Sequence, residues 1–167
     1  KVMNPRPVVL VTGAARRVGR AIALDLAHHG FDVAVHFHTS SHEAQEVVAA
    51  AQAAGARAQA FAADLAQEAA VRQLVTQVAE SFGGLDAVVF TGGIGEHAAS
   101  VRETVCRNAA WLGIQLDAGA NARGDIRISA QGSRVDVLGL RTNEEGMSAR
   151  HTAVLMGEGN VNGTVRF

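Results

Sequence analysis

The chain has 167 residues, of which 48% are hydrophobic and 19% charged, and its formal net charge at pH 7 is −1. This length suits one compact domain, and a charge near zero with no basic stripe argues against a surface for nucleic acid or anionic membranes. Cys106 is the only cysteine, so an internal disulfide and a cysteine-built metal site are excluded. We see no transmembrane run and no secretory signal peptide, and therefore expect a cytoplasmic protein.

Short apolar runs alternate with amphipathic segments through the first half of the chain. Val8–Thr12 is an apolar run ending in a glycine turn, which is typical of a strand buried on both faces. The same criteria predict, in order, a helix Val18–His29, a strand Val33–Phe37, a helix from Ser40 through Ala54, a weaker strand Arg57–Ala62, a helix Ala66–Phe82 and a strand Ala87–Phe90. This alternation indicates parallel strands joined by right-handed helical crossovers.

The second half is less regular. We expect, in order, a helix carrying Val101, Val105 and Leu112 that ends at Gly113, a loop Asp117–Asp125, strands Ile126–Ser129 and Arg134–Leu140 that can form a hairpin about Gln131-Gly132, a helix from Thr142 to about Leu155, and a frayed tail or short edge strand Gly157–Phe167. The predicted fold is α/β: a three-layer, Rossmann-like, doubly wound and mostly parallel sheet. Its strand order is 3-2-1-4-5, with Arg134–Leu140 as the fifth strand.

The turn after the first strand reads TGAARRVGR, residues 12–20. Glycines let the backbone approach a phosphate, and the helix N-terminus offers free N–H groups and a positive dipole. Arg16 and Arg17 can grip a phosphate through paired hydrogen bonds. No acidic residue ends the second strand, where a site that prefers NAD places one, so the pattern favours NADP. The alternative is that these glycines serve only helix capping and packing.

Residues 8–89 resemble the N-terminal half of short-chain dehydrogenases/reductases, and especially the pteridine-reductase-like branch. Residues 12–19 match that branch's TGxxxRxG motif, which has Arg where most members carry the middle Gly. His36–Ser40 resembles the segment that holds the 2′-phosphate of NADP, although the family's usual basic residue near Thr39 is missing. Ala63–Leu65 matches the Asp-Leu pair beside the adenine. The resemblance implies a cofactor site comprising Gly13, Arg16, Arg17, Gly19, His38, Ser40, Asp64 and Leu65. His36 and His38 are alternatively ordinary polar residues at a strand end.

The catalytic part of this resemblance is missing. The family follows its fourth strand with Asn-Asn-Ala-Gly, whereas this chain has FTGG, residues 90–93. The family also uses a Ser and a Tyr-x-x-x-Lys, in which Tyr is the proton donor and Lys lowers the pKa of that Tyr. This chain has no Tyr, and Lys1 is its only lysine. Hydride transfer of the family type therefore lacks its acid and its positioning group.

Residues 86–156 resemble the C-terminal end of acetate and propionate kinases. VFTGGIGE, residues 89–96, is similar to that family's VFTGGIGEN, and TNEE, residues 142–145, matches a second motif. The resemblance implies nucleotide contacts from Gly92, Gly93, Gly95 and Glu96, with Glu144 facing Mg²⁺. Glu144 and Glu145 are alternatively helix-start residues favoured by the dipole. The kinases' N-terminal part, with its phosphate-clamping arginines, has no counterpart, so phosphoryl transfer lacks most of its apparatus.

These two resemblances meet inside the fourth strand, at Leu85–Phe90. Domain boundaries normally fall in exposed linkers, so we interpret the chain as a recombined or engineered chimera. It forms a single composite domain, 1–167, with a reductase-derived segment 1–89, a kinase-derived segment 90–156 and a tail 157–167. The glycine turns Gly13–Gly19 and Gly92–Gly95 should open onto one crevice, at the switch between strands 1 and 4.

Three functions remain open. The first is a folded chimera without turnover that binds NADP(H) or an adenine nucleotide; ATP with Mg²⁺ has weaker support. The second is an active enzyme, either an NADP-dependent reductase or an acetate kinase-related phosphotransferase, which the missing groups oppose. The third is a purely structural protein that binds nothing. We expect a small-molecule nucleotide as the only partner, without nucleic acid or membrane, and self-association is conceivable through an exposed fifth-strand edge.

Overall fold

A computed structural model describes residues 5–140 of the chain. Its elements, in chain order, are β1 Val8–Val11, α1 Arg17–His28, β2 Asp32–Phe37, α2 Ser41–Ala53, β3 Ala58–Ala62, α3 Glu68–Phe82, β4 Ala87–Phe90, α4 Gly92–His97, α5 Ala99–Asn108, the 3-10 turn η1 Ala110–Leu112, α6 Ala118–Arg123 and β5 Asp136–Gly139. The expected final helix and tail, and Glu144 with them, lie outside the described residues.

All five strands run parallel in one sheet of order β3-β2-β1-β4-β5, as the sequence predicts. The register places Leu10 of β1 beside Ala34 of β2 and beside Val88 of β4. Val88 in turn lies beside Val137 of β5. The strand that joins the two resemblances is therefore an interior strand, hydrogen-bonded to elements from both parts of the chain.

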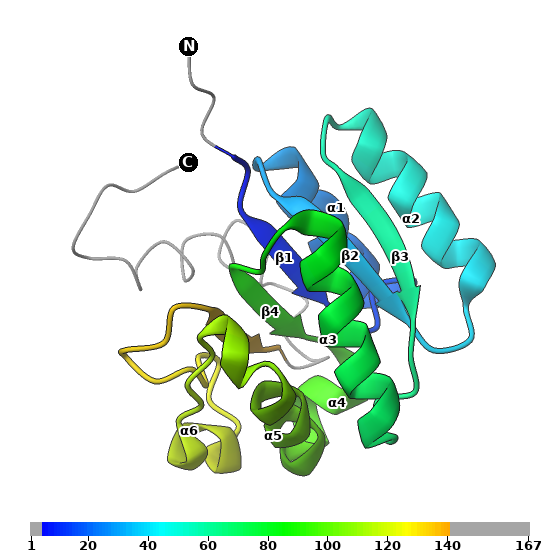
Figure 1. The fold of residues 1–167 in the computed structure, drawn as a ribbon. Coiled ribbons are helices and arrows are strands. Elements are labelled where there is room, and N and C mark those ends of the chain that lie inside the picture. Colours follow the sequence, from blue (N-terminus) through cyan, green and yellow to red (C-terminus); the bar gives the residue numbers. More distant parts are fainter. Residues whose placement is uncertain (1–4, 141–167) are drawn as a thin grey trace.

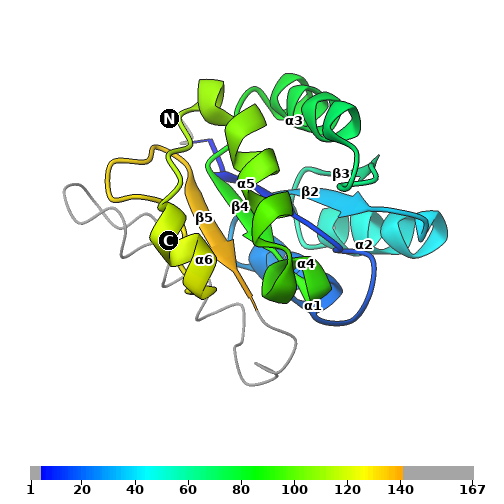
Figure 2. The same cartoon turned by 90° about the horizontal axis from the view of Figure 1, so that it is seen from below.

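Helices cover both faces of this sheet (Figures 1 and 2). On one side, Val9 and Val11 of β1 pack with Ile22 and Leu26 of α1. On the other side, the alternate residue Leu10 belongs to a second core cluster that includes side chains of α3 and α5. Because successive strand residues point to opposite faces, β1 is apolar throughout and all four of its residues are buried. The three-layer Rossmann-like architecture is thus confirmed.

Three expectations for the second half are wrong. The helix expected to carry Val101, Val105 and Leu112 and to end at Gly113 is divided into α5 and η1, since the backbone of Ala109 leaves the α-helical conformation between them. The segment 117–125 contains helix α6 rather than a loop, because Asp117 caps it by accepting a 2.9 Å hydrogen bond from the Ala120 N–H. Residues 126–129 form isolated antiparallel bridges instead of a regular strand, although their pairing with β5 is that of the expected hairpin.

The expected exposed edge at the fifth strand is also wrong. The Ile128 N–H donates to the Val137 carbonyl at 3.0 Å, and the Gly139 N–H donates to the Ile126 carbonyl at 2.8 Å. On its far side the same segment accepts from Asp117, whose N–H lies 2.8 Å from the Ile128 carbonyl. Backbone groups on the outer side of β5 are therefore already paired. Self-association stays a prediction, and the edge of β5 no longer supports it.

Candidate nucleotide-binding site

The turn between β1 and α1 has the backbone geometry that its glycines suggest. Gly13 is exposed and has φ +60, a conformation that glycine adopts without steric cost. Arg17 begins α1 with φ +51 and is the only non-glycine residue in the described part of the chain with a positive φ. This is the position where most short-chain dehydrogenases carry the middle Gly. The left-handed conformation gives the physical reason for that glycine, and Arg17 occupies it under strain.

Gly19 lies where the first turn of α1 crosses the glycine loop. A Cβ at this position would lie 2.1 Å from the Gly13 carbonyl oxygen and 2.7 Å from Thr91 Oγ1. No side chain fits such a gap, so Gly19 permits close packing of α1 against both turns. The motif glycines were also considered as packing residues, and Gly19 has that role, whereas Gly13 is exposed.

Two buried threonines join the exits of β1 and β4. The Thr91 N–H donates to Thr12 Oγ1 at 3.1 Å, and the Thr91 hydroxyl donates back to the Thr12 carbonyl. The loops after the two central strands are consequently adjacent, as expected at the switch point of this sheet. Residues 92–95, expected to form a glycine turn, belong instead to the short helix α4, which begins with Gly92 at φ +69. Gly93, Gly95 and Glu96 lie on it.

His36, at the end of β2, connects the glycine loop to the loop after β3. Its Nδ1 accepts a 3.0 Å hydrogen bond from the Gly13 N–H, and its Nε2 lies 2.9 Å from the Ala63 carbonyl. A carbonyl only accepts, so Nε2 carries the proton and the ring is neutral. Burial lowers the pKa of His36 below its usual value, which outweighs the opposing effect of the Ala63 bond. His36 is therefore a positioning residue beneath the site.

The loop after β3 carries the two residues expected beside an adenine. Asp64 is half-buried, and its Oδ1 accepts a 3.0 Å hydrogen bond from the Ala66 N–H, which fixes the carboxylate at the start of the loop. The Leu65 side chain is buried in the core on the α3 side. Asp64 thus presents a polar group at the carboxyl end of β3, whereas the side chain of Leu65 supports the loop from below.

Basic and polar side chains gather where the loops after β1 and β2 meet. Arg16 Nη2 lies 2.6 Å from Glu43 Oε1 in the first turn of α2. Arg17 is exposed, and its side chain makes no hydrogen bond or ion pair within residues 5–140. His38 is exposed after the end of β2, and Ser40 precedes α2 as its N-cap residue. Arg16 and Arg17 bring positive charge to this corner, and Glu43 brings a negative charge whose contact with Arg16 the motif analysis did not anticipate.

A buried arginine holds the helices that follow β4. Arg102 of α5 donates to the Asn121 Oδ1 and carbonyl oxygens at 2.8 and 3.0 Å, and to the Ile94 carbonyl at 2.8 Å. These bonds join α4, α5 and α6. The sequence does not predict these hydrogen bonds, because arginine and asparagine are usually exposed and nothing around Arg102 or Asn121 marks them as buried. Arg102 thereby holds α4, which begins directly after Thr91.

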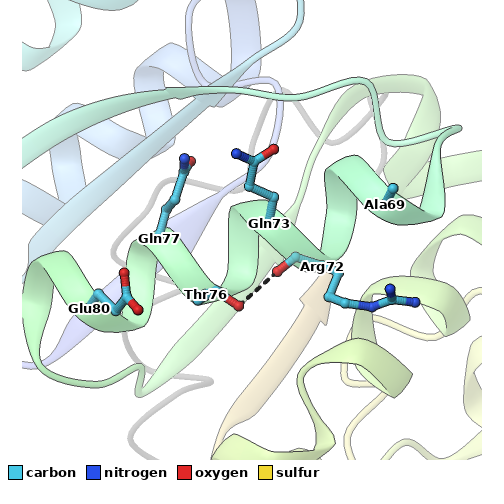
Figure 3. Close-up of a pocket in the computed structure, with 6 residues that line it drawn as sticks. All are labelled: Ala69, Arg72, Gln73, Thr76, Gln77 and Glu80. Carbon is cyan, nitrogen blue, oxygen red and sulfur yellow. Dashed lines mark hydrogen bonds between the residues drawn. The ribbon is translucent and has the colours of Figure 1, made fainter.

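Figure 3 shows a shallow depression along α3, lined by Ala69, Arg72, Gln73, Thr76, Gln77 and Glu80. All six side chains come from this one helix, and none belongs to the predicted cofactor site. Within the described residues no group of three or more His, Cys, Asp or Glu side chains could hold a metal ion. None of the described helices is long and apolar enough to cross a membrane.

Comparison with known protein families agrees with the arrangement of the sheet and the glycine loop. The model for short chain dehydrogenase matches residues 7–111, which is more than half of the chain. The chain belongs to the short-chain dehydrogenase family. A putative dehydrogenase from Burkholderia cenocepacia with bound NADP is 32% identical, with a TM-score of 0.58 over 66% of this chain and 50% of that one. A dehydrogenase/reductase from Sinorhizobium meliloti is 28% identical, also with a TM-score of 0.58. This short-chain dehydrogenase chain therefore spans about half the length of those two structures.

Curated sequence relatives of this family member come from a different enzyme class. Acetate kinase from Rhodopseudomonas palustris is 57% identical over 76 residues, or 44% of this chain and 19% of the kinase. Acetate kinase from Acholeplasma laidlawii is 42% identical over 114 residues, 28% of its length. Too few residues lie outside 7–111 to hold either match, so the dehydrogenase and kinase similarities overlap.

Proposed function

We propose that this chain binds NADP(H) at the corner formed by the loops after β1, β2 and β3, without carrying out hydride transfer of the family type. The observation that carries the proposal is the pair of arginines beside an exposed glycine loop. Gly13 is exposed at φ +60, and Arg17 is exposed with no partner in the described chain. A ligand phosphate is the kind of group that such an arginine can bind, and the missing side chain at Gly13 lets it come close, although the Gly13 N–H itself already donates to His36.

The choice of NADP over NAD rests on charge. β2 ends at Phe37, and the residues after it are His38, Thr39 and Ser40, so no carboxylate stands where a ribose hydroxyl is usually recognised. Arg16 and Arg17 supply the cationic groups for an additional phosphate, and His38 supplies a polar one. The NADP bound to the Burkholderia cenocepacia dehydrogenase, a structural neighbour, supports the same cofactor here. In this proposal Asp64, in the loop after β3, contacts the adenine end of the cofactor.

The proposed lack of turnover rests on composition. This sequence contains no tyrosine, and its single lysine is Lys1, so the Tyr-x-x-x-Lys pair of the family has no counterpart in it. The bound cofactor would supply hydride chemistry, and the chain's own groups would bind and orient it. We further propose that the chain is a recombined or engineered chimera. The overlapping dehydrogenase and kinase similarities around β4 support this origin.

Calorimetric titration with NADP⁺, NAD⁺ and ATP·Mg²⁺ tests the proposal. We expect binding of NADP⁺ that is tighter than binding of NAD⁺ and is weakened in Arg17→Ala. The matched control is Arg123→Ala on α6, which removes an exposed arginine that pairs with the nearby Asp125 at 2.8 Å. Binding of ATP·Mg²⁺ alone would favour the kinase-related alternative. If none of the three ligands produces binding heat, the proposal is refuted and a purely structural protein remains.

A further inference from the structure

The N-terminal ends of α1 and α2 are joined by two ion pairs, one short and one long. Arg16 Nη2 lies 2.6 Å from Glu43 Oε1, and one turn further along each helix Arg20 Nη1 lies 3.5 Å from Glu46 Oε2. The side chain of Arg16 is 63% exposed and that of Glu43 33% exposed. Of these two pairs, only the first adjoins the glycine loop, because Arg16 directly precedes the first residue of α1.

Arg16 and Arg17 consequently differ in their availability to a phosphate. Arg17 has no partner within the described residues, whereas the guanidinium of Arg16 already donates a short hydrogen bond to a carboxylate. Glu43 stays ionised at neutral pH, since bonds from its own backbone N–H and from Arg16 both lower its pKa. A phosphate that binds Arg16 must therefore replace the Glu43 carboxylate as the partner of the guanidinium. It then lies close to that carboxylate, which carries the same sign of charge.

We infer that Glu43 limits the affinity and the selectivity of this site for the phosphorylated dinucleotide, by competing for Arg16 and by repelling the additional phosphate. The inference rests on the proposed function. It adds a specificity-determining residue that lies in α2, beyond the end of β2 where the family's ribose-reading residue is placed. Removing the Glu43 carboxylate should raise the affinity for NADP⁺ on both counts, because it releases Arg16 and removes a charge of the same sign as the phosphate.

The test compares NADP⁺ with NAD⁺ in the folded full chain. In Glu43→Gln we expect NADP⁺ to bind about two- to five-fold more tightly, the range that a partly exposed ion pair allows, with NAD⁺ unchanged. The gain should shrink at high ionic strength. Glu46→Gln is the matched control, because it breaks the neighbouring pair one turn away and should leave both affinities unchanged. Thermal unfolding checks that each variant keeps its fold.

A double-mutant cycle with Arg16→Ala separates competition from a general charge effect. If Glu43 competes for Arg16, Arg16→Ala costs more NADP⁺ affinity in the Glu43→Gln background than in the unmodified chain. The inference is overturned, with the proposed function intact, if NADP⁺ binds but Glu43→Gln weakens it, leaves it unchanged or tightens NAD⁺ equally. It is likewise overturned if the two substitutions are additive. No NADP⁺ binding to either the unmodified chain or Glu43→Gln overturns both proposals.

Discussion

The buried imidazole of His36 accepts a 3.0 Å hydrogen bond at Nδ1 from the backbone N–H of Gly13. This bond ties the end of β2 to the exposed loop that the phosphate is proposed to approach. The neutral ring is required, because a protonated Nδ1 cannot accept. The same ring donates from Nε2 to Ala63, so one side chain fixes loops from three neighbouring strands. Two measurable consequences concern this corner.

The first prediction concerns pH. Burial lowers the pKa of His36 from 6.5, so below that value the unfolded chain binds a proton more readily than the folded chain does. The stability that His36 contributes is therefore fully present above about pH 6.5 and is lost as the pH falls, by at most about 1.4 kcal/mol per pH unit. Urea unfolding at pH 7.5, 6.5 and 5.5 measures this slope.

Two substitutions assign that slope to His36. His36→Asn places no titrating ring beneath Gly13 and should flatten the pH dependence below 6.5. His38→Asn removes an exposed histidine whose charge lowers the pKa of His36 less than burial does, so it should keep most of the slope. An equal slope in His36→Asn and the unmodified chain would show that another group is responsible.

The second prediction concerns Gly19. Gly19→Ala should destabilise the protein by about 3 kcal/mol or more, because its methyl group would meet the Gly13 carbonyl at 2.1 Å and backbone must move. Gly119→Ala on α6 is the control, since its nearest neighbour is the flexible end of Arg123 at 3.0 Å and alanine favours helix. We expect Gly119→Ala to be neutral or to stabilise by up to about 1 kcal/mol. Chemical denaturation measures the free energy of unfolding of both variants, and equal values would contradict the predicted difference.

The regular first half was predictable from sequence for a physical reason. Strands such as β1 are buried on both faces, so their residues form short continuous apolar runs, while Val71, Leu74 and Val78 mark one buried stripe of α3. The sheet order followed because sequential crossovers are right-handed and ligand loops meet at the switch point. Every strand and helix expected before Phe90 is present, with its ends shifted by at most two residues.

The missed features depend on contacts between distant residues. Helix α6 is rich in Gly, Ala and Asn, and it is held by the Asp117 cap and by Asn121 bonded to Arg102 rather than by an apolar stripe. His36 lies on the same face of β2 as Ala34, but its burial depends on the loops above it, which no pattern within β2 reveals. Ion pairs between α1 and α2, such as that of Arg16 with Glu43, likewise follow only from the docking of two helices.

The third prediction exploits the strained backbone at Arg17. Arg17→Gly should relieve the left-handed conformation at φ +51 and raise the free energy of unfolding by up to about 1 kcal/mol, while weakening NADP⁺ binding. Arg17→Ala removes the same guanidinium but keeps a Cβ, so it should weaken binding without the gain in stability. Unfolding and titration of the two variants measure both effects. Equal stabilities of the Gly and Ala variants would show that the conformation carries no strain.

The fourth prediction uses Cys106 as a probe of unfolding. Burial raises the pKa of this thiol to about 12, so almost no thiolate is present at pH 8. A disulfide reagent such as DTNB should therefore not react with the folded chain, and should react once after addition of denaturant. Reaction rates at rising urea concentrations would follow opening of the α5 side of the core. Rapid modification of the native protein at pH 8 would contradict the buried position.

The fifth prediction tests the bonds that hold the helices after β4. Arg102→Lys preserves the positive charge, but an ammonium cannot reach the Asn121 oxygens and the Ile94 carbonyl with the same planar fork. Buried acceptors are then left unpaired, and we expect a loss of about 3 kcal/mol of stability. Arg107→Lys on the same helix is the control, because the 3.1 Å pair of Arg107 with Glu68 is on the surface and should tolerate the change. Equilibrium unfolding compares the two, and an Arg102→Lys variant as stable as Arg107→Lys would show that α4, α5 and α6 hold together without this arginine.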